Sequence, residues 1–144
     1  MKYAKKLNNI DNVIVQDSLK GLAVNGKKVG YQFRMQLDYY RGHFLSVIDV
    51  FEVVVDGKKI SDEHIKFCIN GKEFSPVEFD KCYTEFWYVR EDAIVKVLEP
   101  GGLEQGEHQI DVTMYYRSPY MPIGDNHEYM WIDNCGSRKM RIQD

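Results

Sequence analysis

The chain has 144 residues, of which 44% are hydrophobic and 28% charged, a composition typical of a globular protein about the size of one domain. Its net charge of −3 gives no basic field for nucleic acid or anionic lipid. No apolar run reaches membrane-spanning length or forms a signal-peptide core, and the three cysteines lack CxxC spacing. We therefore expect one cytoplasmic, soluble domain over residues 1–144, with reduced thiols and with no nucleic-acid or membrane partner.

Three short phrases along the chain predict tight turns. Each has Asn or Asp followed by Gly and Lys, between runs of Val, Ile, Phe and Tyr, and they occur at residues 25–27, 56–58 and 70–72. A two-residue type I′ turn needs positive φ at both central positions, which Gly accepts freely and Asn or Asp better than most residues. The sequence therefore predicts three antiparallel hairpins.

Alternation of apolar and polar residues predicts a series of strands. In chain order they are expected at residues 22–24, 31–37, 47–55, 65–69, 86–89, 93–98, 108–117 and 138–142. Helical periodicity is poor, with one short turn expected after Pro76 within residues 75–83. Strands at this spacing, joined by Gly-based turns, predict an all-β fold: an antiparallel two-sheet β-sandwich, either jelly-roll or immunoglobulin-like.

The predicted strand at residues 47–55 is apolar on both faces. One set of side chains is Phe51, Val53 and Val55, and the other is Ile48, Val50 and Val54. In a sandwich only the inner face meets the second sheet. The other face then needs cover from a loop of the same chain, which we favour, or from another protein chain.

Two loops combine paired tyrosines with an arginine, at residues 39–43 (YYRGH) and 115–122 (YYRSPYMP), the second before the longest irregular segment. Tyr and Arg are enriched where surfaces meet partners. The candidate residues for a partner interface or pocket rim are Tyr39, Tyr40, Arg41, His43, Arg117, Tyr120 and Met121. The alternative is that one tyrosine of each pair enters the core while the arginine stacks on the other or binds carbonyl groups. Both remain open from sequence.

Catalytic and metal motifs are sparse. No serine lies in a GxSxG turn, and the histidines show no HxxxH or HxH spacing. His108 continues the inward register of its strand and is best interpreted as a satisfied core or rim histidine. The cluster at residues 125–128 (DNHE) is contiguous, and adjacent residues rarely chelate one ion. We therefore expect neither a catalytic residue set nor a metal or other cofactor in this chain.

An ordered series of segments resembles the small β subunit of bacterial C-glycoside deglycosidases, the C-deglycosylating enzymes. The series comprises GLAVNGKKVGYQFR at 21–34, YYRG at 39–42, FEVVVDG at 51–57, NGKEF at 70–74, EPGGL at 99–103, GEH at 106–108 and YYRSPYMP at 115–122. The resemblance extends from about residue 17 to residue 122 and leaves residues 123–135 unplaced.

The resemblance implies a heteromeric lyase. In this family the β-sandwich subunit pairs with a larger TIM-barrel α subunit, which carries a divalent metal, usually manganese, and the acid–base histidines. The implied substrate is a C-glycoside with a phenolic, flavonoid-type aglycone, already oxidised at the sugar 3-position. The 3-ketone acidifies the C2 hydrogen, so a base can form an enolate and expel the aglycone from C1. This chain would then be a non-catalytic accessory subunit.

A second function class is a stand-alone carbohydrate-binding β-sandwich. Exposed Trp87, Trp131 and Tyr120 would be its natural platform for stacking sugars. Neighbouring genes separate the two hypotheses, because the lyase requires an adjacent TIM-barrel reading frame.

Overall fold

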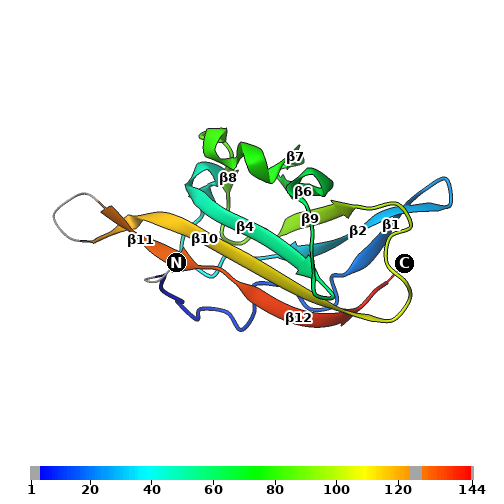
Figure 1. The fold of residues 1–144 in the computed structure, drawn as a ribbon. Helices are drawn as coiled ribbons and strands as arrows, with labels where there is room; N and C mark the ends of the chain where they lie inside the picture. The colour runs from blue at the N-terminus through cyan, green and yellow to red at the C-terminus, as the bar shows by residue number, and fades with distance from the viewer. Residues whose placement is uncertain (1–3, 124–127, 144) are drawn as a thin grey trace.

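The computed structural model describes residues 4–123 and 128–143, with the side chains of 119–123 and 128 left out. Two large antiparallel sheets form the body of the fold (Figure 1). The first sheet has the order β1 (Lys20–Val24), β2 (Lys27–Met35), β9 (Ala93–Leu98), β6 (Ile65–Ile69) and β7 (Lys72–Phe74). The second has the order β11 (Glu128–Asp133), β10 (Glu107–Ile123), β4 (Ile48–Val55) and β5 (Lys58–Lys59), and β12 (Gly136–Arg141) also pairs with β10. The predicted all-β antiparallel sandwich is confirmed.

Several short elements lie outside the two large sheets. β3 (His43–Phe44) and β8 (Phe86–Trp87) form a separate two-stranded sheet. Three 3₁₀ turns, η1 (Leu45–Val47), η2 (Asp62–His64) and η3 (Pro76–Lys81), lie between strands. The third confirms the predicted turn after Pro76, and it begins with a capping box formed by Ser75 and Glu78. Among the described residues, no helix is long and apolar enough to span a membrane.

The three predicted hairpin turns are confirmed by their backbone angles. At the β4–β5 turn, Asp56 has φ 52° and Gly57 has φ 81°. The corresponding values are 52° and 79° in the turn at Asn25, and 55° and 72° in the turn at Asn70. Both central residues therefore occupy the left-handed region that a type I′ turn requires.

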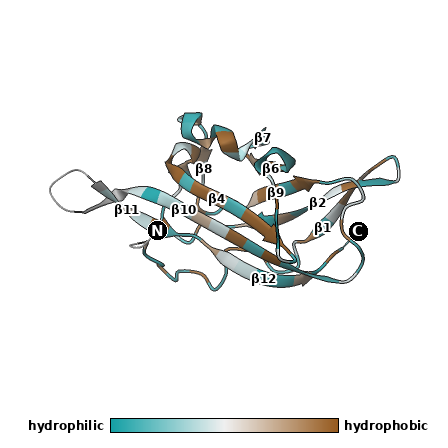
Figure 2. Cartoon of the chain, in the orientation of Figure 1, coloured by the Kyte–Doolittle hydropathy of each residue, from teal (hydrophilic) through white to brown (hydrophobic). Residues whose placement is uncertain are grey.

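The core fills the space between the two sheets. Phe51 of β4 meets Phe67 of β6 edge-on, with ring centroids 5.4 Å apart, so the facing sheets are in direct contact. The inward residues of β2 and β10, such as Phe33 and Met114, are fully buried. Figure 2 shows the matching alternation of hydrophobic and polar residues along β4 and β10.

One predicted face of β4 is wrong because the strand contains a β-bulge. Val50 pairs with Tyr115, whereas Ile48 pairs with Tyr116, so Asp49 is an extra residue in the ladder. The extra residue reverses the alternation at that point. Ile48 is consequently buried in the core at 7% exposure, and the prediction that it shares the outer face with Val50 and Val54 is wrong.

The region after residue 117 is also more regular than predicted. β10 continues to Ile123 and pairs with β11, which the sequence analysis assigned to an irregular segment. The ladder shifts register between Arg117 and Pro122. Prolines and a bulge interrupt the alternating pattern, so the sequence signal for this hairpin is lost.

The terminal segments tie the two sheets together. The Lys5 N–H donates to the Trp131 carbonyl of β11 at 2.9 Å, while the Val15 N–H donates to the Arg34 carbonyl of β2 at 2.9 Å. We call residues 4–19, which precede β1, the N-terminal strap. Since it bonds to one strand of each sheet, the strap bridges one edge of the sandwich.

Candidate functional site

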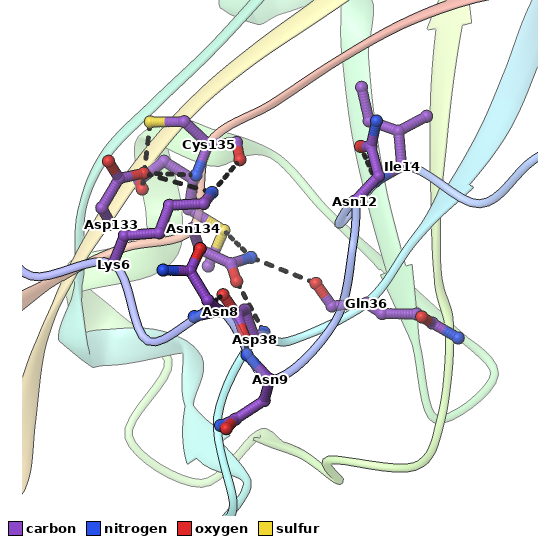
Figure 3. Close-up of polar contacts among 11 residues, drawn as sticks. Lys6, Asn8, Asn9, Asn12, Ile14, Gln36, Asp38, Asp133, Asn134 and Cys135 are labelled. Carbon is purple, nitrogen blue, oxygen red and sulfur yellow. Dashed lines mark hydrogen bonds and ion pairs between the residues drawn. The ribbon is translucent and has the colours of Figure 1, made fainter.

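A buried aspartate anchors the loop between β2 and β3. We call residues 36–42 the tyrosine loop. Asp38 is fully buried, and its carboxyl oxygens accept hydrogen bonds from the backbone N–H groups of Asn8 at 3.0 Å and Asn9 at 2.7 Å (Figure 3). Its own N–H donates to Asn134 Oδ1 at 2.7 Å. The bonds to Asn8 and Asn9 therefore hold the strap against the tyrosine loop.

Asn134, in the connection between β11 and β12, completes this network. Its side-chain amide donates to the Gln36 carbonyl at 3.2 Å, and its backbone N–H donates to the Met114 carbonyl at 2.9 Å. Nearby, Lys6 Nζ donates to the Cys135 carbonyl at 2.6 Å (Figure 3). Four segments that are distant in sequence thus meet at one buried polar cluster.

Tyr39 enters the core beside His43. The Tyr39 hydroxyl and Ser118 Oγ are hydrogen-bonded at 2.5 Å, and its ring meets His43 edge-on at 4.7 Å between centroids. His43 also packs on Tyr116 at 4.5 Å. Burial lowers the pKa of His43 to about 4, so the imidazole is neutral at pH 7.

The side chains of Tyr40 and Arg41 are exposed, unlike that of Tyr39. Tyr40 is 59% exposed and stacks on the buried Tyr39 ring at 4.5 Å between centroids. The Arg41 guanidinium carbon lies 5.7 Å from the centre of the Tyr40 ring, within range of a cation–π contact. The tyrosine loop thus has one tyrosine in the core and the other exposed beneath its arginine.

The second tyrosine–arginine segment has a similar arrangement. Tyr116 is fully buried, and Arg117 Nε donates to both carboxyl oxygens of Asp49, at 3.1 and 2.8 Å. Arg117 Nη2 donates to the Ser46 carbonyl at 3.1 Å. Both arginines therefore contact their own chain, as in the alternative weighed from sequence, and an interface role for either stays a prediction.

Part of the predicted site lies outside the described region. Tyr120 and Met121 belong to β10, and their side chains are among those left out. Of the polar cluster at residues 125–128, nothing is described except the backbone of Glu128 in β11. Within residues 4–123 and 128–143, no group of three His, Cys, Asp or Glu side chains could hold a metal ion.

His108 is a satisfied rim histidine, which confirms its interpretation from sequence. Its Nδ1 lies 2.6 Å from Asp56 Oδ2, and its Nε2 lies 2.7 Å from the Glu104 carbonyl oxygen. Burial alone would lower the pKa of His108, but the bonds to Asp56 and Glu104 outweigh it and raise the pKa above its usual value. The pair fastens the β4–β5 turn to the start of β10.

Trp87 is not a sugar-stacking platform. It is buried at 1% exposure, its Nε1 donates to the Glu91 carbonyl at 2.8 Å, and it packs on Phe67 at 5.2 Å between ring centroids. Trp131 is half-buried on β11. The exposed tryptophan surface expected for a stand-alone carbohydrate-binding module is therefore wrong at Trp87.

The aromatic residues around Trp87 make up a surface that the sequence analysis missed. Phe44 pairs with Phe86 across β3 and β8, with ring centroids 4.9 Å apart, and Phe86 meets Tyr88 at 5.0 Å. We call Phe44, Phe86 and Tyr88 the aromatic row. Consecutive aromatics at residues 86–88 do not show which of them faces outward, so the sequence carried no signal for this surface.

A hollow of about 360 Å³ adjoins the tyrosine loop. Three segments line it: the strap through Ile10, the tyrosine loop through Leu37 and Tyr40, and the segment after β8 through Val89 and Arg90. Gly42, at the end of the tyrosine loop, lies against the Phe86 ring. The tyrosine loop, which lines the hollow, therefore also adjoins the aromatic row.

Residues 10–120 match the family described as C-glycoside deglycosidase beta subunit. A C-glycoside deglycosidase beta subunit of Eubacterium cellulosolvens is 41% identical over 98 residues, covering 68% of this chain and 67% of the relative. A 3'-dehydrocarminate deglycosidase beta subunit of a Microbacterium species is 32% identical, covering 78% and 81%. A C-glycoside deglycosidase beta subunit of Microbacterium trichothecenolyticum is 28% identical, covering 91% and 95%. The resemblance inferred from sequence is confirmed.

Replacing the buried anchor should destabilise the protein strongly. Asp38→Ala leaves the N–H groups of Asn8 and Asn9 without their acceptor, and we expect the free energy of unfolding in urea to fall by about 2–5 kcal/mol. Asp92→Ala is the control, because the bonds that Asp92 accepts within the described part of the chain come from the partly exposed side chains of Arg34 and Gln36. Its loss should stay below about 1 kcal/mol. Equal losses in the two variants would contradict the anchoring role.

Acidification should weaken the fold through His43. Its pKa is lowered to about 4 in the folded state, so the unfolded chain, with an ordinary value near 6.5, takes up a proton first as pH falls. The stability that neutral His43 contributes to the folded state is complete above pH 6.5. Its share of the free energy of unfolding should decline by about 2 kcal/mol by pH 5. Urea titrations at several pH values should show a shallower acid slope for His43→Leu.

His108→Gln provides a control of opposite sign. The raised pKa of His108 adds stability that is complete below about pH 6.5 and is lost as pH rises through the folded value. The His108→Gln substitution should therefore lower the free energy of unfolding most at pH 6 and below. An acid slope unchanged by His43→Leu would show that His43 is not held neutral by the fold.

Proposed function

This chain belongs to the C-glycoside deglycosidase β-subunit family, and on that basis we propose that it is the non-catalytic subunit of a complex that cleaves the bond between sugar and aglycone carbon in a C-glycoside. The observation that carries the proposal is the match over residues 10–120, which contain the whole first sheet. The partner we propose is a larger TIM-barrel α subunit that binds a divalent cation, with manganese the first choice.

The proposed substrate is a C-glycoside with a phenolic aglycone and a ketone at sugar C3. The ketone acidifies the hydrogen on C2, so a base can remove that proton. The C1–C2 double bond forms as the bond from C1 to the aglycone breaks, and the aglycone carbon takes up a proton. A divalent cation in the α subunit would stabilise the negative charge that develops on the ketone oxygen.

The contacts of this chain's titratable side chains support a non-catalytic role. His43 is buried between Tyr39 and Tyr116, and its lowered pKa makes it a weak base. His108 is occupied by Asp56 and the Glu104 carbonyl. These groups serve the fold, and we assign the acid–base step to the α subunit.

We also propose that the complex works in the cytoplasm. Cys68, Cys82 and Cys135 are free thiols in the structure, a state that a reducing compartment maintains. Burial is the main cause that raises the pKa of the Cys68 thiol to about 11, so this thiol is largely un-ionised at neutral pH.

Reconstitution tests the proposed function. The purified chain alone should leave a 3-oxo-C-glucoside intact, and release of the aglycone should begin when the cognate α subunit and Mn²⁺ are both added. Chromatography of the free aglycone measures the reaction, with omission of each component as the control. Cation-dependent turnover by this chain in a preparation shown by mass spectrometry to lack the α subunit would refute the proposal.

A further inference from the structure

The tyrosine loop borders both the aromatic row and the hollow at the β3–β8 end of the fold. We propose that this surface, made by Phe44, Phe86, Tyr88 and the Arg90 side of the hollow, is where the α subunit docks. This inference rests on the proposed function, since it takes the α subunit as the occupant.

Strand alternation explains why the row faces outward. Side chains directly opposite each other in an antiparallel pair share a face, so His43 and Trp87 point inward together. The neighbouring pair, Phe44 and Phe86, must then point outward. Phe44 is 42% exposed and Tyr88 is 53% exposed. Isolated apolar residues are common on protein surfaces, but contiguous aromatic rings mark interaction sites.

The row is rigid before any partner arrives. Trp87 fixes its inner side to the core through Phe67, and Asn70 Nδ2 donates to the Phe86 carbonyl at 2.9 Å. Gly42 lies so close that a Cβ there would overlap both the Trp87 carbonyl oxygen and the Phe86 ring. A surface that is already ordered loses little conformational entropy on binding, which favours its use as an anchor.

The chemistry of the hollow specifies the occupant. Ile10, Leu37 and Val89 give it apolar walls, Asn9 and Gln36 add polar groups, and the exposed Arg90 also lines it. An apolar side chain with a neighbouring carboxylate would satisfy both features, because a guanidinium binds carboxylates with two-point geometry. We therefore expect the α subunit to present such a segment here.

Charge argues against a second copy of this chain as the occupant. A symmetric dimer uses the same patch on both subunits. Pairing this surface with itself would gather four arginines, Arg41 and Arg90 of each copy, in one interface. A different partner with acidic residues around an apolar anchor fits the surface better.

Binding measurements with the purified cognate α subunit test the proposal. Tyr88→Ala and Arg90→Glu should each raise the Kd for the α subunit at least tenfold, and the effect of Arg90→Glu should shrink at high salt. Val24→Ala is the matched control: Val24 is 58% exposed and lies in the β1–β2 hairpin, far from β8 (Figure 1). Its Kd should stay within twofold of the unmodified chain, and all three variants should melt within a few degrees of it.

The outcomes separate the surface from the function. If the unmodified chain binds the α subunit and the Tyr88 and Arg90 variants bind equally well, the docking surface is wrong while the proposed function stands. If the unmodified chain does not bind the α subunit, both are overturned. Dimerisation of this chain that Tyr88→Ala abolishes, with α-subunit affinity unchanged, would make a second copy the occupant and would also overturn the proposal.

Discussion

The burial of the Asp38 carboxyl group is the constraint on which the arrangement of the strap, the tyrosine loop and the β11–β12 connection depends. A carboxyl group withdrawn from water is costly unless hydrogen bonds replace its hydration. Asp38 obtains them from the N–H groups of Asn8 and Asn9, and its own N–H is held by Asn134. The strap, the tyrosine loop and the β11–β12 connection must therefore fold together at this point. The direction of Tyr39 into the core, and of Tyr40 away from it, follows from that placement.

In the described part of the chain, most of the arginine and histidine side chains considered for catalysis or recognition instead stabilise the fold. Arg117 binds Asp49 and the Ser46 carbonyl, and His108 binds Asp56. The β3–β8 end differs, because rigid aromatic rings are left exposed there beside an arginine-flanked hollow. Such a distribution suits a subunit that contributes shape and a docking surface to a complex whose chemistry takes place on its partner.

Local rules in the sequence were enough for the three hairpin turns and for the all-β sandwich class, but not for the β10–β11 hairpin. The Asp56-Gly57 phrase demands positive φ at two adjacent residues, and the alternation from Tyr31 to Met35 of β2 is unbroken, so both were predictable. Ile48 was misplaced because a bulge at Asp49 depends on the partner strand, which a single strand's pattern does not reveal. Trp87 was misplaced because its aromatic neighbours on both sides hide which face is buried. The Asp38 network joins residues 96 positions apart, a distance over which sequence periodicity carries no information.

The most direct test of this account is amide hydrogen exchange of the chain alone and in complex with the α subunit. Docking at the β3–β8 end should slow exchange in the loop amides of residues 39–42 and 88–91, since binding excludes water from both segments. Exchange in the β1–β2 hairpin around Val24 should not change. Slowed exchange confined to β4 and β10, with residues 88–91 unaffected, would contradict this account. It would place the partner on the outer face of the sheet that contains β4 and β10.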